Sequence, residues 1–309
     1  MVNHTWTLSM MRIKLALRSR TFLFFSLAMP IGFLFGYVIF FGGSNRNEIP
    51  YLLGAILALT VMGSFWGLSM QLVMFREQGI LRRFRLAPIG AGAMLGSSII
   101  SNYFLVLPTV IVEFLVCRYV FHMPTWGNLW EVFFLISIGA AAFSALGLII
   151  ASVTNDVQET TVINNILWSS FLFLSGVTIP LTFMPRWVQK VTLFSPATYL
   201  ATGLENAMLR SATVHEVMGD VFSLLVSLIV AFEISRRIFR WEPEEKIPNK
   251  AKLWAAAALI PFLLLGSWEV VYGHRLEEMR HDFQLMSRPA PAPPRKNPTG
   301  QIGLRKSSE

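Results

Sequence analysis

The sequence predicts an all-helical protein that crosses a membrane several times. Hydrophobic residues make up 54% of its 309 positions, and charged residues only 14%. Five stretches of more than 20 residues carry no charge, and about 20 apolar residues suffice for one helical crossing. Soluble domains carry about 25% charged residues, so the composition excludes one or two soluble globular domains.

The first expected element is an amphipathic helix within residues 1–20. Trp6, Met10, Ile13 and Leu17 recur at helical spacing and form one apolar stripe, with basic residues beside it. Such a helix would lie on the cytoplasmic surface of the membrane. The alternative is a solvated lead-in whose basic residues only set the topology.

Uncharged stretches then place crossings near residues 21–41, 50–74, 92–117, 131–153 and 161–180. Two shorter stretches, 217–239 and 251–273, predict two more crossings, although the second could instead lie on the membrane surface. Small residues at GxxxG spacing let helices approach closely. Three such spacings occur in the first three crossings, at Gly32/Gly36, Gly63/Gly67 and Gly92/Gly96.

Basic residues set the expected orientation. The N-terminus, the loop after the second crossing and the segment after the sixth carry 14 Lys and Arg residues, whereas the loops on the other side carry 5. Basic residues accumulate in cytoplasmic loops, so the N-terminus is expected to be cytoplasmic. With seven crossings the tail, residues 274–309, would lie outside. The end of the tail is proline-rich, and we expect disorder from about residue 287.

Two loops have the composition of folded elements. Residues 75–88 (FREQGILRRFRLAP) combine arginines with apolar residues, so a short helix there could rest in a groove of a cytoplasmic partner. The alternative is a loop that only orients the protein. In the outer loop, residues 181–216, Pro185 and Pro196 can each begin a helix. This pair would lie on the outer leaflet or pack as a lid on the ends of the crossings.

Motifs for chemistry are missing from the sequence. The chain has no Gly-Lys pair, hence no P-loop for a nucleotide, and neither HExxH nor GxSxG. The histidines show no metal-ligand spacing, and Cys117 is the single cysteine. Glu113, Glu233 and Glu269 lie in or near crossings, and we expect each near a helix end, within reach of headgroups or of an arginine such as Arg118. Nucleic acid is not an expected partner, because basic residues in such a chain orient loops.

Two segments resemble the ABC-2 type transporter permeases. FREQGILRRFRLAPIG is similar to the cytoplasmic segment that couples these permeases to their ATPase. Residues 171–210 are similar to the end of their fifth helix and to their outer re-entrant helices. The matching positions in this second segment are Leu174, Ser175, Gly176, Pro180, Pro185, Trp187, Pro196, Thr198 and Arg210.

The resemblance implies a six-helix transmembrane domain over residues 21–240, to which 251–273 would add a helix. It implies a multi-pass protein of the bacterial cytoplasmic membrane, in contact with lipid and paired as a homodimer or heterodimer of permeases. Separate ATP-binding subunits would hold ATP and Mg. The assembly would export an amphipathic cargo such as a drug, an antibiotic, a lipid or a lipid-linked glycan. The alternatives are a membrane-embedded lipid or glycan transferase and an ion-coupled carrier.

The resemblance also implies candidate site residues, none of them catalytic or metal-binding. The expected contacts to the ATPase are Arg76, Glu77, Gly79, Leu81, Arg82, Arg83, Arg85 and Pro88. The second and fifth crossings line the transport path in this family, which suggests a wall made by Phe65, Trp66, Asn164, Asn165 and Ser169. The outer re-entrant helices contribute Pro180, Pro185, Trp187, Pro196, Tyr199 and Arg210.

Overall fold

The computed structural model describes most of the chain and confirms the all-helical fold class. It describes residues 20–41, 49–85, 90–178, 184–209, 218–242 and 260–272, together with Leu253, Ala257 and seven positions between Trp6 and Arg18. The described residues contain helices and turns but no strand. The predicted tail, residues 274–309, lies outside this part of the chain.

Eleven helices are described in full along the chain. Their bounds are α2 (Arg20–Phe41), α3 (Ile49–Met62), α4 (Ser64–Glu77), α5 (Ile80–Arg85), α6 (Ala91–Tyr119), α7 (Leu129–Val153), α8 (Val157–Leu174), α9 (Arg186–Thr192), α10 (Pro196–Leu209), α11 (Met218–Ile238) and α13 (Ile260–Tyr272).

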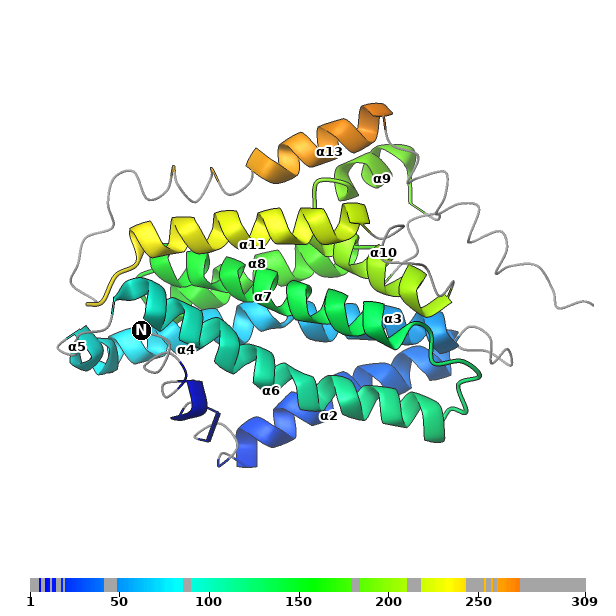
Figure 1. The fold of residues 1–309 in the computed structure, drawn as a ribbon, viewed down its shortest axis with the longest axis horizontal. Helices are drawn as coiled ribbons and strands as arrows, with labels where there is room; N and C mark the ends of the chain where they lie inside the picture. The colour runs from blue at the N-terminus through cyan, green and yellow to red at the C-terminus, as the bar shows by residue number, and fades with distance from the viewer. Residues whose placement is uncertain are drawn as a thin grey trace, which may run out of the picture. The chain divides into compact units, whose positions relative to one another are not determined.

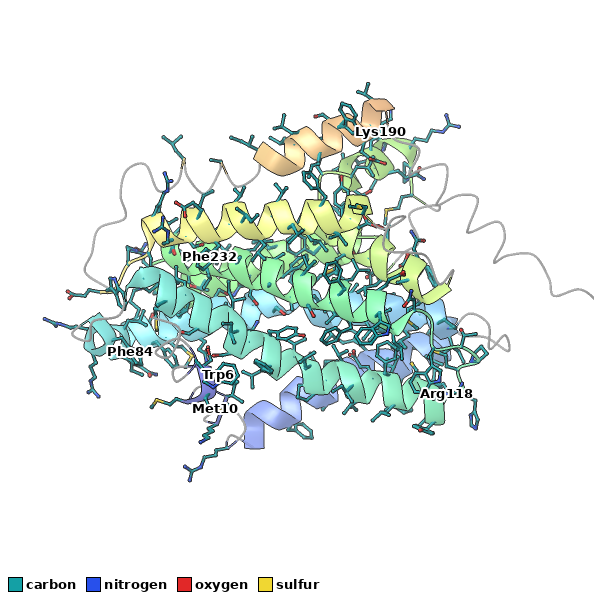
Figure 2. All side chains as sticks on the ribbon, viewed as in Figure 1. Trp6, Met10, Phe84, Arg118, Lys190 and Phe232 are labelled. Carbon is teal, nitrogen blue, oxygen red and sulfur yellow. The ribbon has the colours of Figure 1, made fainter. Side chains whose placement is uncertain are left out.

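The long helices run between two ends of the bundle, which we call the α5 end and the α9 end (Figure 1). The short helix α5 lies at the first, and α9 and α10 lie at the second. Phe84 of α5 and Lys190 of α9 mark the two ends in Figure 2. Successive long helices run in alternating directions, as expected for a chain that crosses a membrane repeatedly.

The centre of the bundle is α7, which packs against α4 on one side and α11 on the other. Its 25 residues include a single charged residue, Glu131, and most of its side chains are buried. A helix that is apolar on all sides is stable only when it is surrounded. Phe65 of α4 and Phe143 of α7 are among the largest fully buried side chains of this core.

Four helical segments of the described chain are long and apolar enough to cross a membrane. The first consists of α3 and α4 in succession, and the other three are α6, α7 and α11. They agree with the crossings predicted near 50–74, 92–117, 131–153 and 217–239. The crossing predicted at 161–180 is displaced, because α8 runs from Val157 to Leu174. Asp156 caps its first turn by accepting a hydrogen bond from Glu159 N, and Gly176 turns the chain after it with φ of 87°.

Close helix packing occurs at glycines other than the predicted ones. A Cβ atom at Gly147 of α7 would lie 2.4 Å from the Phe65 carbonyl oxygen, so the backbones of α7 and α4 touch. A Cβ at Gly67 or Gly96 would meet no described atom within 4 Å. A Cβ at Gly92 would lie 3.4 Å from the Arg236 side chain, and one at Gly63 would lie 3.9 Å from the Trp168 ring. The GxxxG spacing therefore marks helix contacts only in part, because it does not say which side of the helix meets a neighbour.

Two flanking segments pack onto the bundle. Near the N-terminus, the buried Ser9 hydroxyl donates to Ser97 O of α6 at 3.1 Å, and the Trp6 ring meets Phe104 edge-on with centroids 6.2 Å apart. At the other terminus, α13 contacts α11 and α9. A Cβ on Gly266 of α13 would lie 2.4 Å from the Phe194 ring, so this helix is seated closely on the α9 end.

Candidate functional site

A tight turn at Gly79 separates α4 from α5. Gly79 has φ of 69°, in the left-handed region that favours glycine, and its N–H donates to Arg76 O at 3.0 Å. Gln78 N–H donates to Met74 O at 3.0 Å, which closes the last turn of α4. The glycine in the predicted coupling segment thus has a conformational role, because it lets α5 begin with only two residues between it and the end of α4.

The six residues of α5 divide into an inner and an outer face. Leu81 is 1% exposed and packs in a cluster with Leu72 and Met94, which Phe84 partly joins. Arg82 and Arg83 point outward, and the Arg82 side chain is 72% exposed. A short helix held by its apolar side therefore presents two adjacent guanidinium groups at the α5 end.

The residues predicted to contact an ATPase lie in different environments. Arg76 and Leu81 are buried inside the chain, and Glu77 is exposed but uses Oε1 to accept a hydrogen bond from Val157 N at 2.8 Å. The Arg85 side chain and Pro88 lie outside the described residues. Within α5 the exposed residues are Arg82 and Arg83, because a six-residue helix cannot be anchored without burying one side.

Two buried arginines bind the C-terminal end of α7. Arg76 of α4 donates to Ala151 O at 2.7 Å and Thr154 O at 2.6 Å. Arg240, which follows α11, donates to Ser152 O at 3.2 Å and also to Thr154 O. The last carbonyl groups of a helix have no partner within the helix and carry partial negative charge. The two guanidinium groups satisfy them and join α4, α7 and the end of α11.

Sequence reasoning missed this junction. It treated Arg240 as one of six basic residues that orient the segment after the sixth crossing, and nothing in the spacing distinguishes it from Arg236 or Arg237. In the structure Arg236 and Arg237 are exposed and bind Glu233 on their own helix at about 3 Å. Only the fold brings Arg240 to α7.

A cavity of about 750 Å³ lies between α2, the α3–α4 helix pair, α6 and α8. Its wall is largely aromatic and aliphatic, and includes Phe33, Trp66 and Trp168. The two tryptophan rings meet edge-on with centroids 6.3 Å apart. Asn102 and Asn165 add amide groups to the wall. A mostly apolar cavity with a few polar groups is typical of sites for small amphipathic molecules.

The residues predicted to line the transport path lie in three different environments. Trp66 and Asn165 line the cavity. Phe65 is fully buried in the core, and Asn164 is fully buried with its amide nitrogen 2.9 Å from Ser69 Oγ, where it joins α8 to α4. Ser169 is exposed and is not part of the described wall. A run of polar residues on α8 spreads around the helix, so only some of its members reach any one cavity.

Sequence reasoning missed several wall residues, including Trp168 and Asn102. Trp168 lies three residues after Asn165, which puts it on the same side of α8. That helical spacing was the signal for it. Asn102 comes from α6, which no motif connected with the path, and its amide donates to Ser144 Oγ of α7 at 2.8 Å. Its place in the wall follows only from the packing.

Glu113 is fully buried behind this wall, where it had been predicted near a helix end beside Arg118. Thr60, which lines the cavity, donates to Glu113 Oε1 at 2.5 Å. Arg118 turns away, donating to Pro124 O at 3.4 Å and lying 5.3 Å over the Trp126 ring. The prediction was wrong because α6 continues to Tyr119, so Glu113 lies inside the helix and faces α3.

The outer loop is a folded lid at the α9 end. As predicted, Pro185 and Pro196 begin α9 and α10, and the Ser195 hydroxyl accepts a hydrogen bond from Ala197 N at 3.3 Å. The Tyr199 hydroxyl donates to Leu193 O at 2.8 Å. The helix α10 packs against α3, α7 and α11, a packing that the lid alternative predicts. Trp187 is 70% exposed, while Pro180 and Arg210 lie outside the described residues.

One carboxyl group fixes this lid to the second crossing. Glu205 of α10 accepts a hydrogen bond from the Tyr51 hydroxyl of α3, and its Oε1 atom is inaccessible. Burial raises the pKa of the Glu205 carboxyl to about 8, although the hydrogen bond from Tyr51 opposes that shift. A Cβ on Gly54 of α3 would lie 3.1 Å from the Glu205 backbone, so the two helices are in close contact.

Comparison with known proteins places this geometry in a family. The family described as "ABC-2 type transporter" matches residues 3–209. The chain is 25% identical over 183 residues to the probable multidrug ABC transporter permease YbhS of Escherichia coli strain K12, across 59% of this chain and 46% of that protein. The chain thus spans about half the length of that relative.

Two further relatives are matched over more of their length. The chain is 28% identical over 209 residues to the putative transport permease YvfS of Bacillus subtilis strain 168, across 63% of this chain and 81% of that protein. It is 26% identical over 225 residues to the daunorubicin resistance ABC transporter permease protein DrrB1 of Streptomyces coeruleorubidus, across 69% and 77%. A multi-pass bundle of apolar helices, matched over two thirds of its length, therefore makes this chain a member of the ABC-2 type transporter family.

Proposed function

We propose that this chain is the permease subunit of an ATP-driven exporter in the bacterial cytoplasmic membrane. A separate ATP-binding subunit docks at the α5 end, which faces the cytoplasm, and hydrolyses ATP with Mg. Permeases of this family generally pair with such a subunit. The relatives named for multidrug and daunorubicin resistance support an amphipathic, drug-like cargo. A homodimer or heterodimer of permeases forms the translocating unit.

The observation that carries this proposal is the connection between α5 and the cavity. Arg82 and Arg83 face outward, where a partner can reach them, while Leu81 holds α5 to the bundle. Glu77, at the end of α4, binds the first residue of α8, and α8 supplies Trp168 to the cavity wall. A partner that moves α5 therefore acts on helices that form the cavity.

The test is assembly with an ATPase. The purified full chain is mixed in detergent with candidate ABC ATPases, and bound ATPase is measured by affinity capture. We expect the double variant Arg82→Glu, Arg83→Glu to lose most of the bound ATPase, because reversed charge repels a surface that arginines complement.

The matched control is Arg186→Glu, Lys190→Glu. It reverses two exposed basic residues of another short helix, α9, at the opposite end of the bundle. The control should bind ATPase like the parent chain. If the α5 variant keeps full binding, the coupling role is wrong. If transport in vesicles runs on an ion gradient without ATP, the chain is a carrier of another class.

A further inference from the structure

The cavity wall conceals an acidic group. Thr60 lines the cavity, and its hydroxyl group donates a hydrogen bond to Glu113, whose side chain is fully buried. In the described part of the chain, no basic side chain pairs with Glu113, and its second oxygen, Oε2, is inaccessible and has no hydrogen-bond donor. Buried polar groups usually have partners, so an incompletely satisfied carboxyl group calls for an explanation.

The surroundings of Glu113 make its negative charge costly. Among the described residues its hydrogen-bond partner is a neutral hydroxyl, and Phe114, Cys117 and Val110 are buried nearby on the same helix. A buried carboxylate without a cationic partner is strongly disfavoured. A positive charge placed in the cavity would offset that cost, because Coulomb attraction is only weakly screened in an apolar region.

The cavity wall itself suits a positive charge. The rings of Trp66 and Trp168 pack edge to face with their centroids 6.3 Å apart, and both line the cavity. The face of an indole ring attracts cations. Phe33 and Leu105 offer apolar surface for the remainder of a ligand, and Asn102 and Asn165 are neutral. No basic residue belongs to the described wall, so nothing in it repels a cation.

We propose that the cavity binds an amphipathic cation, a molecule with an aromatic or aliphatic body and one delocalised positive charge, and that Glu113 sets this charge preference. The inference rests on the proposed function, since it takes the cavity as the cargo site. It adds the class of cargo and a specificity-determining residue outside the wall. Glu113 acts through its field and through the Thr60 hydroxyl, which it orients.

The test measures charge selectivity without any ATPase. Equilibrium dialysis of the full chain in detergent is performed with radiolabelled tetraphenylphosphonium and with the neutral triphenylphosphine oxide. We expect the parent chain to bind the cation more tightly than the neutral compound. Glu113→Gln should weaken cation binding about tenfold, equivalent to roughly 1.4 kcal/mol, and leave binding of the neutral compound unchanged. Glu113→Asp, which keeps the charge, should retain the preference for the cation.

Glu131→Gln is the matched control, because it also removes a buried carboxyl but lies on α7 away from the described wall. It should bind both compounds like the parent chain. The proposal is overturned if the parent shows no saturable cation binding, if it binds the two compounds equally, or if Glu113→Gln weakens both alike. ATPase capture by Glu113→Gln distinguishes the cation site from the proposed coupling to an ATPase. If Glu113→Gln loses its preference for the cation but still captures the ATPase, both proposals are supported. If the parent chain prefers the cation but captures no ATPase, the cation site is supported and the proposed function is not.

Discussion

Arg76 and Arg240 donate hydrogen bonds to the same carbonyl oxygen, that of Thr154. One arginine ends the second crossing and the other follows α11, so the two bonds join distant parts of the chain at the end of α7. Hydrogen bonds from charged donors to buried acceptors are stronger than neutral ones. This shared acceptor makes the α5 end of the bundle a single connected unit.

Removal of one of these arginines should destabilise the bundle. We expect Arg240→Gln to lower the free energy of unfolding by about 2 kcal/mol, because buried carbonyl groups lose a charged donor. The measurement is thermal unfolding in detergent. Arg237→Gln is the control, since Arg237 is exposed and forms an ion pair with Glu233 on its own helix, and exposed pairs contribute about 0–1 kcal/mol. Equal effects of the two variants would contradict the role given to Arg240.

The turn at Gly79 should tolerate no side chain. Gly79→Ala places a Cβ on a residue with φ of 69°, and we expect a loss of roughly 1 kcal/mol of stability together with weaker capture of an ATPase. The control is Gly90→Ala, at the start of α6, where φ is −72° and a Cβ meets no described atom within 4 Å. If both variants behave alike, the turn conformation does not position α5.

The contact between α7 and α4 should be sensitive to a single methyl group. Gly147→Ala would put a Cβ 2.4 Å from Phe65 O, so we expect a loss of about 1–3 kcal/mol from overpacking. Gly96→Ala, in a GxxxG pair with open space around it, should have no such cost and can gain helix propensity. Thermal unfolding of the two variants compares a true helix contact with one that the spacing alone suggested.

The orientation of the two ends can be read by cysteine labelling. Cys117 is buried and free, so it gives a low background with a membrane-impermeant maleimide. In intact cells we expect Lys190→Cys to be labelled and Arg83→Cys to be protected. In inside-out vesicles the pattern should reverse. Labelling of Arg83→Cys from outside would place α5 on the wrong side of the membrane for an ATPase.

The lid should loosen as the pH rises. Burial raises the Glu205 pKa from 4.5 to about 8 in the folded chain, so the folded state binds more protons than the unfolded state between these values. This contribution to stability is therefore present below about pH 4.5 and is lost as the pH rises through about 8. Glu205→Gln, which cannot ionise, should gain thermal stability relative to the parent between pH 6 and 9. A constant difference across that range would contradict the assignment.

Much of the fold could be predicted from the sequence because membrane helices obey a simple constraint. Long uncharged stretches located α6 and α7 to within a few residues, a shorter apolar stretch located α11, and proline positions located the starts of α9 and α10. The helix ends that were predicted wrongly depend on local capping. Asp156 and Gly176 set the ends of α8, and these single residues carry more weight than the hydropathy of the whole stretch.

The site was less predictable, because a motif names residue types but not the direction of side chains. Within the coupling segment, Arg76 and Arg83 are indistinguishable in sequence, yet one is buried at α7 and the other faces outward. Glu113 looked like a helix-end residue because Arg118 follows five positions later. Its true environment depends on Thr60, which comes from another helix and belongs to no motif.

The bond between Glu77 and Val157 has a mechanical consequence. With 18 residues, α8 is a rod of about 27 Å, held at its foot by α4 and carrying Trp168 well along its length. When a rigid helix tilts, the displacement of a residue grows with its distance from the pivot. A tilt of a few degrees at the foot of α8 therefore displaces the Trp168 indole by about an ångström or more. If an ATPase moved the foot of α8, small displacements there would change the shape of the cavity without any helix unwinding.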